Sequence, residues 1–186
     1  MQWQFQAPQK LTCVTTADFD GDGRKAVIAG CLNGRVYALD SRGNLQWQFE
    51  PNPYKGESSF RTVFPAQLTG RGGQVVIAGA DNWRYYAIDG LGAELWNYEA
   101  VHPATVGMAA DIDQDGKDEI LTGTIWSQWS CVNPDGGRRW TYDSSKLGGR
   151  RLNAVAVGDL TGNGKQDVLF GGADAVIPQR LQVNSS

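Results

Sequence analysis

The residues best placed to do chemistry are acidic side chains at alternate positions of a short loop that contains glycine. The loop has carboxylates at its first, third, fifth and ninth positions, which are Asp111, Asp113, Asp115 and Glu119. Gly116 permits a sharp bend, and Lys117 offers a backbone carbonyl. Ca²⁺ takes about six to eight oxygen ligands in a flexible geometry. The spacing therefore predicts a Ca²⁺ site in this loop.

A loop nearer the C-terminus repeats this spacing with uncharged donors in place of some carboxylates. With a backbone carbonyl from the lysine, its ligand positions hold Asp159, Thr161, Asn163, Lys165 and Asp167. Fewer carboxylates give the loop a smaller negative charge, so we expect it to bind Ca²⁺ more weakly.

Two further loops of the same length lack part of the ligand set. The loop nearest the N-terminus keeps three carboxylates, Asp18, Asp20 and Asp22. Its ninth position is Ala26, which leaves the shell open, and the loop of the second repeat has Gln67 first and Arg71 fifth, which argues against a cation. In every loop the alternative is an Asx turn, whose first side chain only accepts backbone hydrogen bonds. A bound Ca²⁺ would be structural, because it stabilises the folded chain to which it binds.

These loops recur at a regular period, and each lies between two short apolar runs. Their first residues are separated by 49, 44 and 48 residues. Tryptophans in Trp-x-Phe/Tyr segments or their equivalents recur at Trp3, Trp47, Trp96 and Trp140. A period in the forties without helical periodicity is typical of the four-stranded blades of a β-propeller. We therefore predict one all-β domain over residues 1–186, with four blades per chain.

The repeats also predict how the propeller closes. They cover about residues 7–50, 51–99, 100–143, and 144–186 together with 1–6. The fourth repeat ends after its expected third strand, Arg180–Asn184, and its missing fourth strand lies around Trp3. From Trp140 through the C-terminus to Trp3 the count is 49 residues, which matches the period. Three arrangements fit: a four-bladed monomer with exchanged terminal strands, a homodimer that completes an eight-bladed ring, and an excised piece of a larger propeller.

The repeated D-x-D-x-D-G-x-x-[DE] loop resembles the FG-GAP/VCBS repeat of integrin-α-type propellers. The segment Tyr37–Phe49 resembles the repeat of pyrroloquinoline-quinone-type (PQQ-like) propellers. Together the two likenesses cover nearly the whole chain. They imply a β-propeller with Ca²⁺ in loops on one face, in a family of ligand-binding or adhesion modules and some polysaccharide lyases. The chain lacks the vicinal cysteine pair of many quinone enzymes, so we expect no quinone chemistry.

The connections at the edge opposite these loops are the expected ligand-binding face. They contribute aromatic and basic side chains at Tyr54, Arg61, Trp83, Trp126, Arg150 and Arg151. Such residues suit a sugar or an anionic ligand, through stacking and paired hydrogen bonds. Binding residues also concentrate on loops held by a rigid scaffold. The alternative is that the tryptophans cap neighbouring blades and the arginines are solvated.

These observations favour a non-catalytic, calcium-stabilised binding module that recognises a protein or a glycan on its loop face. The alternative is an enzyme resembling the polysaccharide lyases, or a fragment of one. In that case His102, or Tyr54 with Arg61, would supply the base beside a neutralised uronate. No spacing in the sequence enforces such an arrangement.

Composition argues against several other classes. The net charge is −3 and no block of Lys and Arg stands out, so we expect no nucleic-acid partner. No apolar run approaches the roughly 18 residues of a membrane span, and no signal peptide is expected in this chain. Cys13, Cys31 and Cys131 form no C-x-x-C pair and are expected to be small buried residues. The compartment stays open, since calcium loops indicate an extracellular or cell-surface protein and unpaired cysteines a cytoplasmic one.

Overall fold

Short strands make up the regular structure of the chain. The computed structural model describes residues 3–55, 58–143, 145, 151–172 and 176–179, and this part of the chain contains fifteen β-strands. Runs rich in Val, Ile, Ala and Tyr form the strands, and turns with glycine or Asp end them, as expected from β-propensity and turn chemistry. No helix among the described residues is long and apolar enough to cross a membrane.

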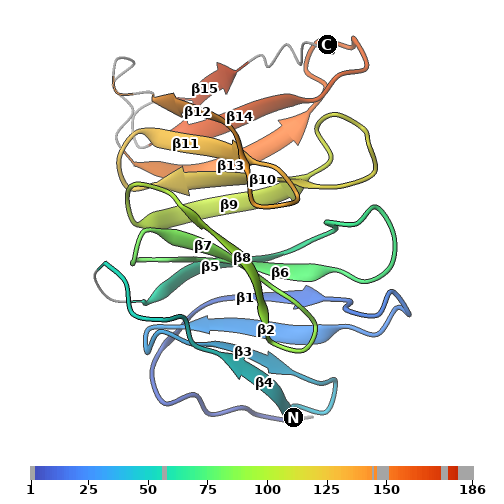
Figure 1. The fold of residues 1–186 in the computed structure, drawn as a ribbon, viewed down its shortest axis with the longest axis vertical. Coiled ribbons are helices and arrows are strands. Elements are labelled where there is room, and N and C mark those ends of the chain that lie inside the picture. Colours follow the sequence, from blue (N-terminus) through green and yellow to red (C-terminus); the bar gives the residue numbers. More distant parts are fainter. Residues whose placement is uncertain (1–2, 56–57, 144, 146–150, 173–175, 180–186) are drawn as a thin grey trace.

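The strands form four antiparallel sheets, or blades, in chain order (Figure 1). The first blade contains β1 (Leu11–Ala17), β2 (Ala26–Cys31), β3 (Val36–Leu39) and β4 (Leu45–Phe49). The second contains β5 (Phe60–Ala66), β6 (Val75–Ala80), β7 (Arg84–Ile88) and β8 (Glu94–Glu99). The third contains β9 (Ala104–Ala110), β10 (Glu119–Thr124), β11 (Gln128–Val132) and β12 (Arg138–Asp143). The fourth, within the described residues, contains β13 (Leu152–Gly158), β14 (Asp167–Gly172) and β15 (Val176–Gln179).

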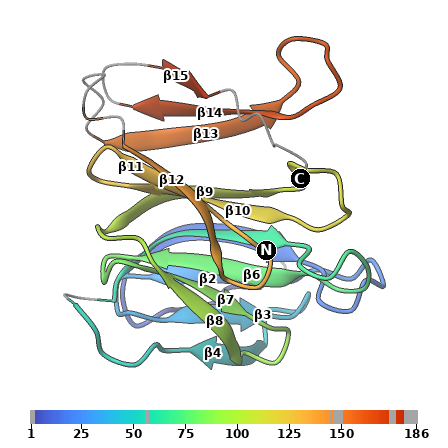
Figure 2. The ribbon, with the colours of Figure 1, turned by 45° about the horizontal axis from the view of Figure 1, so that its top comes forward.

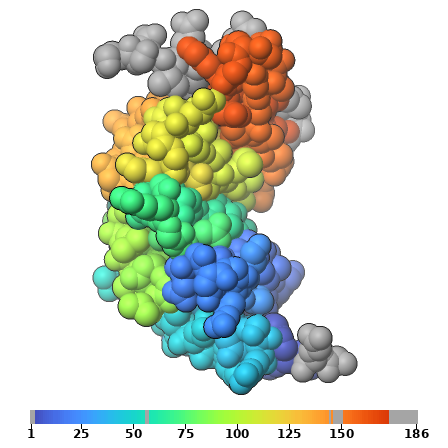
Figure 3. Space-filling model, turned by 90° about the vertical axis from the view of Figure 1, so that its right-hand side faces the viewer, coloured from blue at the N-terminus to red at the C-terminus, as the bar shows by residue number. Residues whose placement is uncertain are grey.

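The blades stack face to face in chain order (Figure 3), and the first strands β1, β5, β9 and β13 pack beside one another. The first and fourth blades lie at opposite ends of the stack (Figure 2), so no ring closes within the described part of one chain. Residues 3–5, the expected exchanged strand, form no strand here. Within the described residues the third strand of the fourth blade is β15, and the predicted strand Arg180–Asn184 lies outside them. The all-β blade architecture is confirmed, and closure stays a prediction.

Apolar side chains on both faces of each blade form the core. Successive residues of a strand point to opposite faces, so Tyr86 packs against the first blade and Tyr85 against the third. The Tyr85 hydroxyl is buried and lies 2.7 Å from the carbonyl oxygens of both Val106 and Gly123, which share its single proton. Burial raises the pKa of Tyr85 above its ordinary value, so the hydroxyl stays protonated and bridges the two blades. A third cluster, centred on Trp129, joins the third and fourth blades.

The first and second blades each contact the following blade through a tryptophan. The indole Nε1 of Trp47 donates to the carbonyl of Gly90 at 3.0 Å, and its ring covers Gly92. Trp96 repeats this contact on Pro134, at 3.0 Å, and on Gly136. Both glycines have a φ near 86°, and a Cβ there would lie within 3.0 Å of the indole. These tryptophans therefore pack between blades, as the sequence predicts.

The loops at one edge of the blades form a second contact between neighbours. The Gln74 N–H donates to the Asp18 carbonyl at 2.7 Å, and the Gln74 side-chain oxygen accepts from the Asp18 N–H at 2.9 Å. A Cβ on Gly73 would lie 1.4 Å from the carbonyl oxygen of Phe19. Only glycine therefore fits at position 73.

Replacing Gly73 with Ala should separate the first two blades at this edge. We expect Gly73→Ala to lower the free energy of unfolding by at least about 2 kcal/mol, because the backbone has to move to admit the methyl group. Gly158→Ala is the matched control, since a Cβ there meets nothing within 4 Å. Denaturant unfolding measures both, and equal stabilities of the two variants would contradict the prediction.

The three cysteines are free, with Cys31 and Cys131 buried and Cys13 half-buried. Burial raises the pKa of the Cys131 thiol to about 12. The expectation that they are small packing residues is confirmed for the two buried ones.

Candidate functional site

Four nine-residue loops join the first and second strands of the blades, along the right-hand side of Figure 1. We call them loop 1 (residues 18–26), loop 2 (67–75), loop 3 (111–119) and loop 4 (159–167). Their fourth residues, Gly21, Gly70, Gln114 and Gly162, have φ between 65° and 75°. Their sixth residues, Gly23, Gly72, Gly116 and Gly164, have φ between 79° and 88°. All four loops thus share one backbone shape, whatever their charge.

The first side chain of each loop holds this shape by accepting backbone hydrogen bonds. Asp18 accepts from the N–H groups of Gly21 and Gly23, both at 2.8 Å. The N–H of Gly164 does the same for Asp159 at 2.7 Å. These bonds favour the ionised carboxylate, so the Gly23 N–H lowers the pKa of Asp18 and the Gly164 N–H lowers the pKa of Asp159. The Asx-turn geometry is therefore present in the loops.

Loop 2 reaches the same conformation without a carboxylate. The Gln67 side-chain oxygen accepts from the N–H of Thr69 at 3.2 Å, and its amide donates to the Gly72 carbonyl at 3.0 Å. The loop shape therefore does not require a bound cation.

Loop 3 brings carboxylates together as the sequence predicts. Oxygens of Asp111, Asp113 and Asp115 lie within 4.8 Å of one another, and among the described residues they form the one such acidic group. Lys117 approaches Asp115 with its amine at 4.0 Å. Three of the five expected donors thus converge on one point at the surface.

Glu119, the first residue of β10, is buried and does not join that group. It is 1% exposed and accepts from the Ile112 N–H at 3.1 Å. Arg139, on β12, pairs with Glu119 at 2.9 Å and with Asp113 at 2.6 Å. Burial raises the pKa of Glu119 to about 6, although the guanidinium opposes the rise. The ninth residue of loop 4, Asp167, bonds in the same way, with its carboxylate 3.0 Å from the Leu160 N–H.

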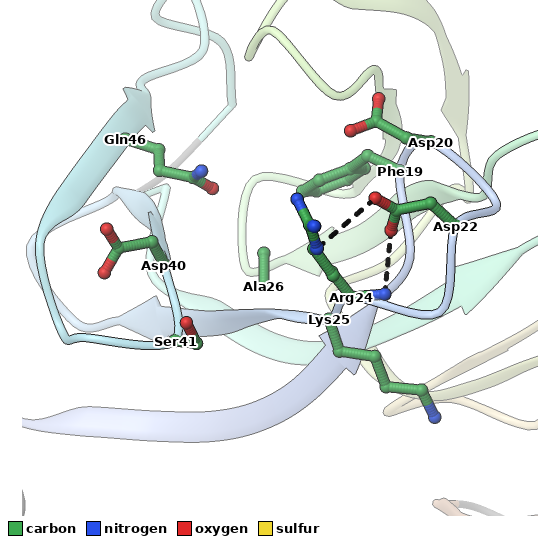
Figure 4. A pocket seen from close by; sticks show the side chains of 9 residues that line it. All are labelled: Phe19, Asp20, Asp22, Arg24, Lys25, Ala26, Asp40, Ser41 and Gln46. Atoms are coloured by element: carbon green, nitrogen blue, oxygen red, sulfur yellow. Dashed lines mark hydrogen bonds and ion pairs between the residues drawn. The ribbon is translucent and has the colours of Figure 1, made fainter.

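The carboxylates of loop 1 form no such acidic group among the described residues. Asp22 accepts from the Arg24 N–H at 2.8 Å and faces the Arg24 guanidinium at 3.7 Å. Asp20 and Asp22 stand on one side of a pocket of about 230 Å³, with Asp40 on the other side (Figure 4). In loop 4, Asn163 accepts from the Lys165 N–H at 2.8 Å. The predicted Ca²⁺ ligands of these loops stay predictions.

At the opposite edge, three aromatic rings form a row across the second and third blades. The ring centroids of Trp83 and His102 are 5.5 Å apart, and those of His102 and Trp126 are 6.1 Å apart. Trp83 lies in the β6–β7 turn, His102 between β8 and β9, and Trp126 in the β10–β11 turn. Trp126 is 56% exposed. We call these three residues the aromatic row.

Trp83 has an unfavourable backbone conformation. Its φ is 72°, and the equivalent residue of the first blade is Gly34, with a φ of 80°. A bulky side chain in this left-handed region is costly, and such strain is typical of functional sites. Val101 has a φ of 63° nearby, and the Ala100 N–H donates to the Trp83 carbonyl at 2.8 Å. The fold thus keeps an indole where glycine would be easier.

Charged side chains border the aromatic row on the second blade. The Lys55 amine lies 4.8 Å from the Trp83 ring centroid and 2.9 Å from the Glu99 carboxylate. Tyr54 donates its hydroxyl to Glu99 at 2.8 Å. The Arg84 guanidinium lies 3.5 Å from the Tyr54 ring centroid, and its buried Nε has no hydrogen-bond partner among the described residues. Two cations and one carboxylate give this cluster a net positive charge.

Three of the six predicted ligand residues, Tyr54, Trp83 and Trp126, lie in one cluster. The Lys55 amine lies near the rings of both Tyr54 and Trp83. The His102 ring lies between those of Trp83 and Trp126. Arg61 instead holds Asp81 with bonds of 2.9 and 2.5 Å. Arg151 is exposed, and Arg150 lies outside the described residues. Lys55, Arg84 and Glu99 were not predicted. Their signal in the sequence is only their position next to Tyr54, Trp83 and the end of β8.

A second hollow lies beside this cluster, on the first blade. It has a volume of about 460 Å³ and is lined by Gln9, Leu32, Asn33, Gly34, Glu50, Pro51, Pro53 and Ser58. Glu50, Pro51 and Pro53 of the pocket belong to the same β4–β5 connection as Tyr54 and Lys55. The pocket and the aromatic row therefore share one edge of the stack.

The ion pair at Glu99 should titrate at low pH. Lys55 lowers the pKa of Glu99 below its ordinary 4.5, so the pair stabilises the fold above that pH and is lost as pH falls through the lower folded value. We expect an NMR titration of the Glu99 carboxyl to have its midpoint below 4.5, and Lys55→Met to raise it. Stability at neutral pH should change little, since the pair is exposed. An unchanged midpoint in Lys55→Met would contradict this account.

Comparison with known proteins places the fold among the β-propellers. Residues 11–92 match the family model described as the lambda-carrageenase β-propeller domain, which is less than half of the chain. No curated protein matches the chain. A crystal structure of BBS1N in complex with ARL6DN, soaked with lead, has a TM-score of 0.67 at 14% identity, over 93% of this chain and 54% of that one.

A crystal structure of BamB from Moraxella catarrhalis has a TM-score of 0.60 at 18% identity, over 96% of this chain and 49% of that one. At these identities the likeness shows the fold alone. The chain spans about half the length of the solved structures it matches. The fold and the comparisons together define a β-propeller domain.

Proposed function

We propose that this chain is a non-catalytic binding module that takes a carbohydrate polymer along the aromatic row. The observation that carries the proposal is the row itself, in which Trp83, His102 and Trp126 are in sequential ring contact across two blades. The faces of sugar rings are apolar C–H surfaces that pack on aromatic rings. A continuous strip of rings offers a polymer more than one such contact.

The charges beside the aromatic row favour an anionic polymer. Lys55 and Arg84 border the row, and Glu99 is the carboxylate that accompanies them. Arginine and lysine form charge-assisted hydrogen bonds with acidic groups. The match to a propeller domain named after a carrageenase, a polysaccharide-degrading enzyme, supports the same ligand class.

Replacing the indoles should remove binding and leave the fold intact. We expect Trp126→Ala and Trp83→Gly each to weaken binding of carrageenan at least about tenfold, since truncating an exposed aromatic anchor costs more than about 1 kcal/mol. Trp83→Gly restores the residue that the first blade has at this turn, so its melting temperature should not fall. Isothermal titration calorimetry measures the affinities. Leu91→Ala is the control, because Leu91 is 87% exposed in a turn at the other edge.

Carrageenan binding that is equal in Trp83→Gly, Trp126→Ala and the wild type would overturn the proposal. The lyase-like alternative predicts a different outcome. On a uronate polymer a lyase would produce unsaturated chain ends that absorb ultraviolet light, and His102→Ala would abolish them. Appearance of such ends would replace the binding module with an enzyme.

We also propose that loop 3 holds a structural Ca²⁺ ion. Asp111, Asp113 and Asp115 fit it, because three carboxylates converge and hard oxygen donors are those that Ca²⁺ prefers. The Lys117 carbonyl would complete the protein donors. Glu119 fits less well, because Arg139 and the Ile112 N–H engage it. The ion would neutralise the acidic group and hold the loop.

Calcium should therefore raise the melting temperature. At about 100 times its dissociation constant a ligand stabilises by about 2.7 kcal/mol, which is about 5–10 °C for a chain of this size. Asp115→Asn should remove most of this shift relative to EDTA, since it removes a donor that Arg139 does not hold. Glu50→Gln is the control and should keep it, because Glu50 is exposed, pairs with Arg35 and lies outside the four loops. A melting temperature that is the same in EDTA and in Ca²⁺ would contradict the proposal.

A further inference from the structure

The first blade leaves apolar residues exposed at positions that are buried in the second blade. Val14 pairs with Ala29 in the same register as Val63 with Ala78. Val63 packs against the first blade and is 7% exposed, whereas Val14 is 69% exposed. Leu11 is likewise 39% exposed, and its equivalent Phe60 is fully buried. This face of the first blade is shaped for another blade.

The fourth blade exposes an apolar residue on the side that would face a following blade. The second residue of each loop packs toward the following blade, so Leu68 is 9% exposed and Ile112 is 5% exposed. The equivalent Leu160 is 59% exposed. The two ends of the stack therefore offer the two halves of one ordinary contact between blades.

Trp3 already occupies the place of a tryptophan from a preceding blade. Its indole Nε1 donates to the Ser41 carbonyl at 3.1 Å, and a Cβ on Gly43 would lie 2.6 Å from its ring. Ser41 and Gly43 correspond to Gly90 and Gly92, on which Trp47 of the fourth strand of the first blade docks. By the same rule, Trp3 belongs to the fourth strand of a blade that precedes the first. The fourth blade, within the described residues, has three strands and lacks that one.

We propose that a second copy of this chain closes the propeller. The first blade of each copy packs on the fourth blade of the other, and residues 3–5 of one copy add the missing strand beside β15 of the other. Two identical contacts related by a two-fold axis then close a ring, so no open interface remains. The sheet edge at β15 is covered by the same step.

Curvature supports this partner. Position eight of loop 2 donates its backbone N–H to the carbonyl of position one of loop 1, through Gln74 and Asp18. In the closed ring the corresponding backbone pair is Lys25 of one copy and Asp159 of the other. The stack also overlays about half of propeller chains longer than itself, as expected if four blades subtend about half of a ring.

The proposal is independent of ligand binding, because the aromatic row lies on the second and third blades, away from both ends of the stack. Light scattering on the 186-residue protein tests it. We expect a mass of twice 20.2 kDa. Val14→Asp and Leu160→Asp should each halve that mass while the circular dichroism spectrum stays that of a β-protein. Leu91→Asp, which charges a more exposed leucine outside both ends, should leave the dimer intact.

A cross-linking experiment tests the register without disturbing the apolar faces. We expect a mixture of Lys25→Cys and Asp159→Cys chains, co-refolded and oxidised, to yield a disulfide-linked heterodimer, and Lys25→Cys chains alone to yield none. A wild-type mass of 20.2 kDa would overturn the proposal. A dimer insensitive to both Val14→Asp and Leu160→Asp, or absence of the mixed cross-link in a dimeric sample, would overturn it as well.

Discussion

Apolar packing between neighbouring blades is the interaction on which the rest of the molecule depends. A single small antiparallel sheet is marginally stable in water, and here Tyr85 and Tyr86 send adjacent side chains into two different interfaces. Because every blade needs a neighbour on each face, the loops at both edges are placed by stacking. Stability in such an array is the sum of repeat and interface contributions, so within a single chain the first and fourth blades, which have one neighbour each, are the weakest parts.

The two edges of the stack differ in how much their loops vary from blade to blade. At one edge, glycines and a first-position acceptor fix four loops in one shape, and neighbouring loops bond to each other through backbone groups. At the other edge, the turns vary from blade to blade, and one of them carries Trp83 in a conformation that Gly34 adopts in the first blade. A rigid, repeated edge and a variable edge together form the arrangement expected when a scaffold presents binding residues on its loops.

Much of this fold could be predicted because its determinants are local. The period of the Trp segments and the spacing of Asp111, Asp113 and Asp115 are properties of short stretches, and the structure keeps them. Contacts across strands could not be read in the same way. Arg139 reaches Glu119 from β12, and Lys55 reaches Glu99 from a different connection. β15 was not predicted, because Val176–Gln179 lacks the Tyr-Ala-Leu-Asp pattern of Tyr37–Asp40 in the first blade. The contacts of Arg139 and Lys55 depend on how strands and connections pack together, which local sequence propensity does not determine.

Loop 2 has a consequence for how such an edge changes over evolution. Gln67 closes its loop as Asp18 does, with a neutral amide in place of a carboxylate. Since backbone shape depends on the glycines and on any side-chain acceptor, the charge of each loop is free to vary independently. Each blade's loop therefore sets the electrostatic potential at its own part of this edge. A lineage could gain or lose acidity in one loop by point substitution and leave the architecture, and the opposite edge, as they were.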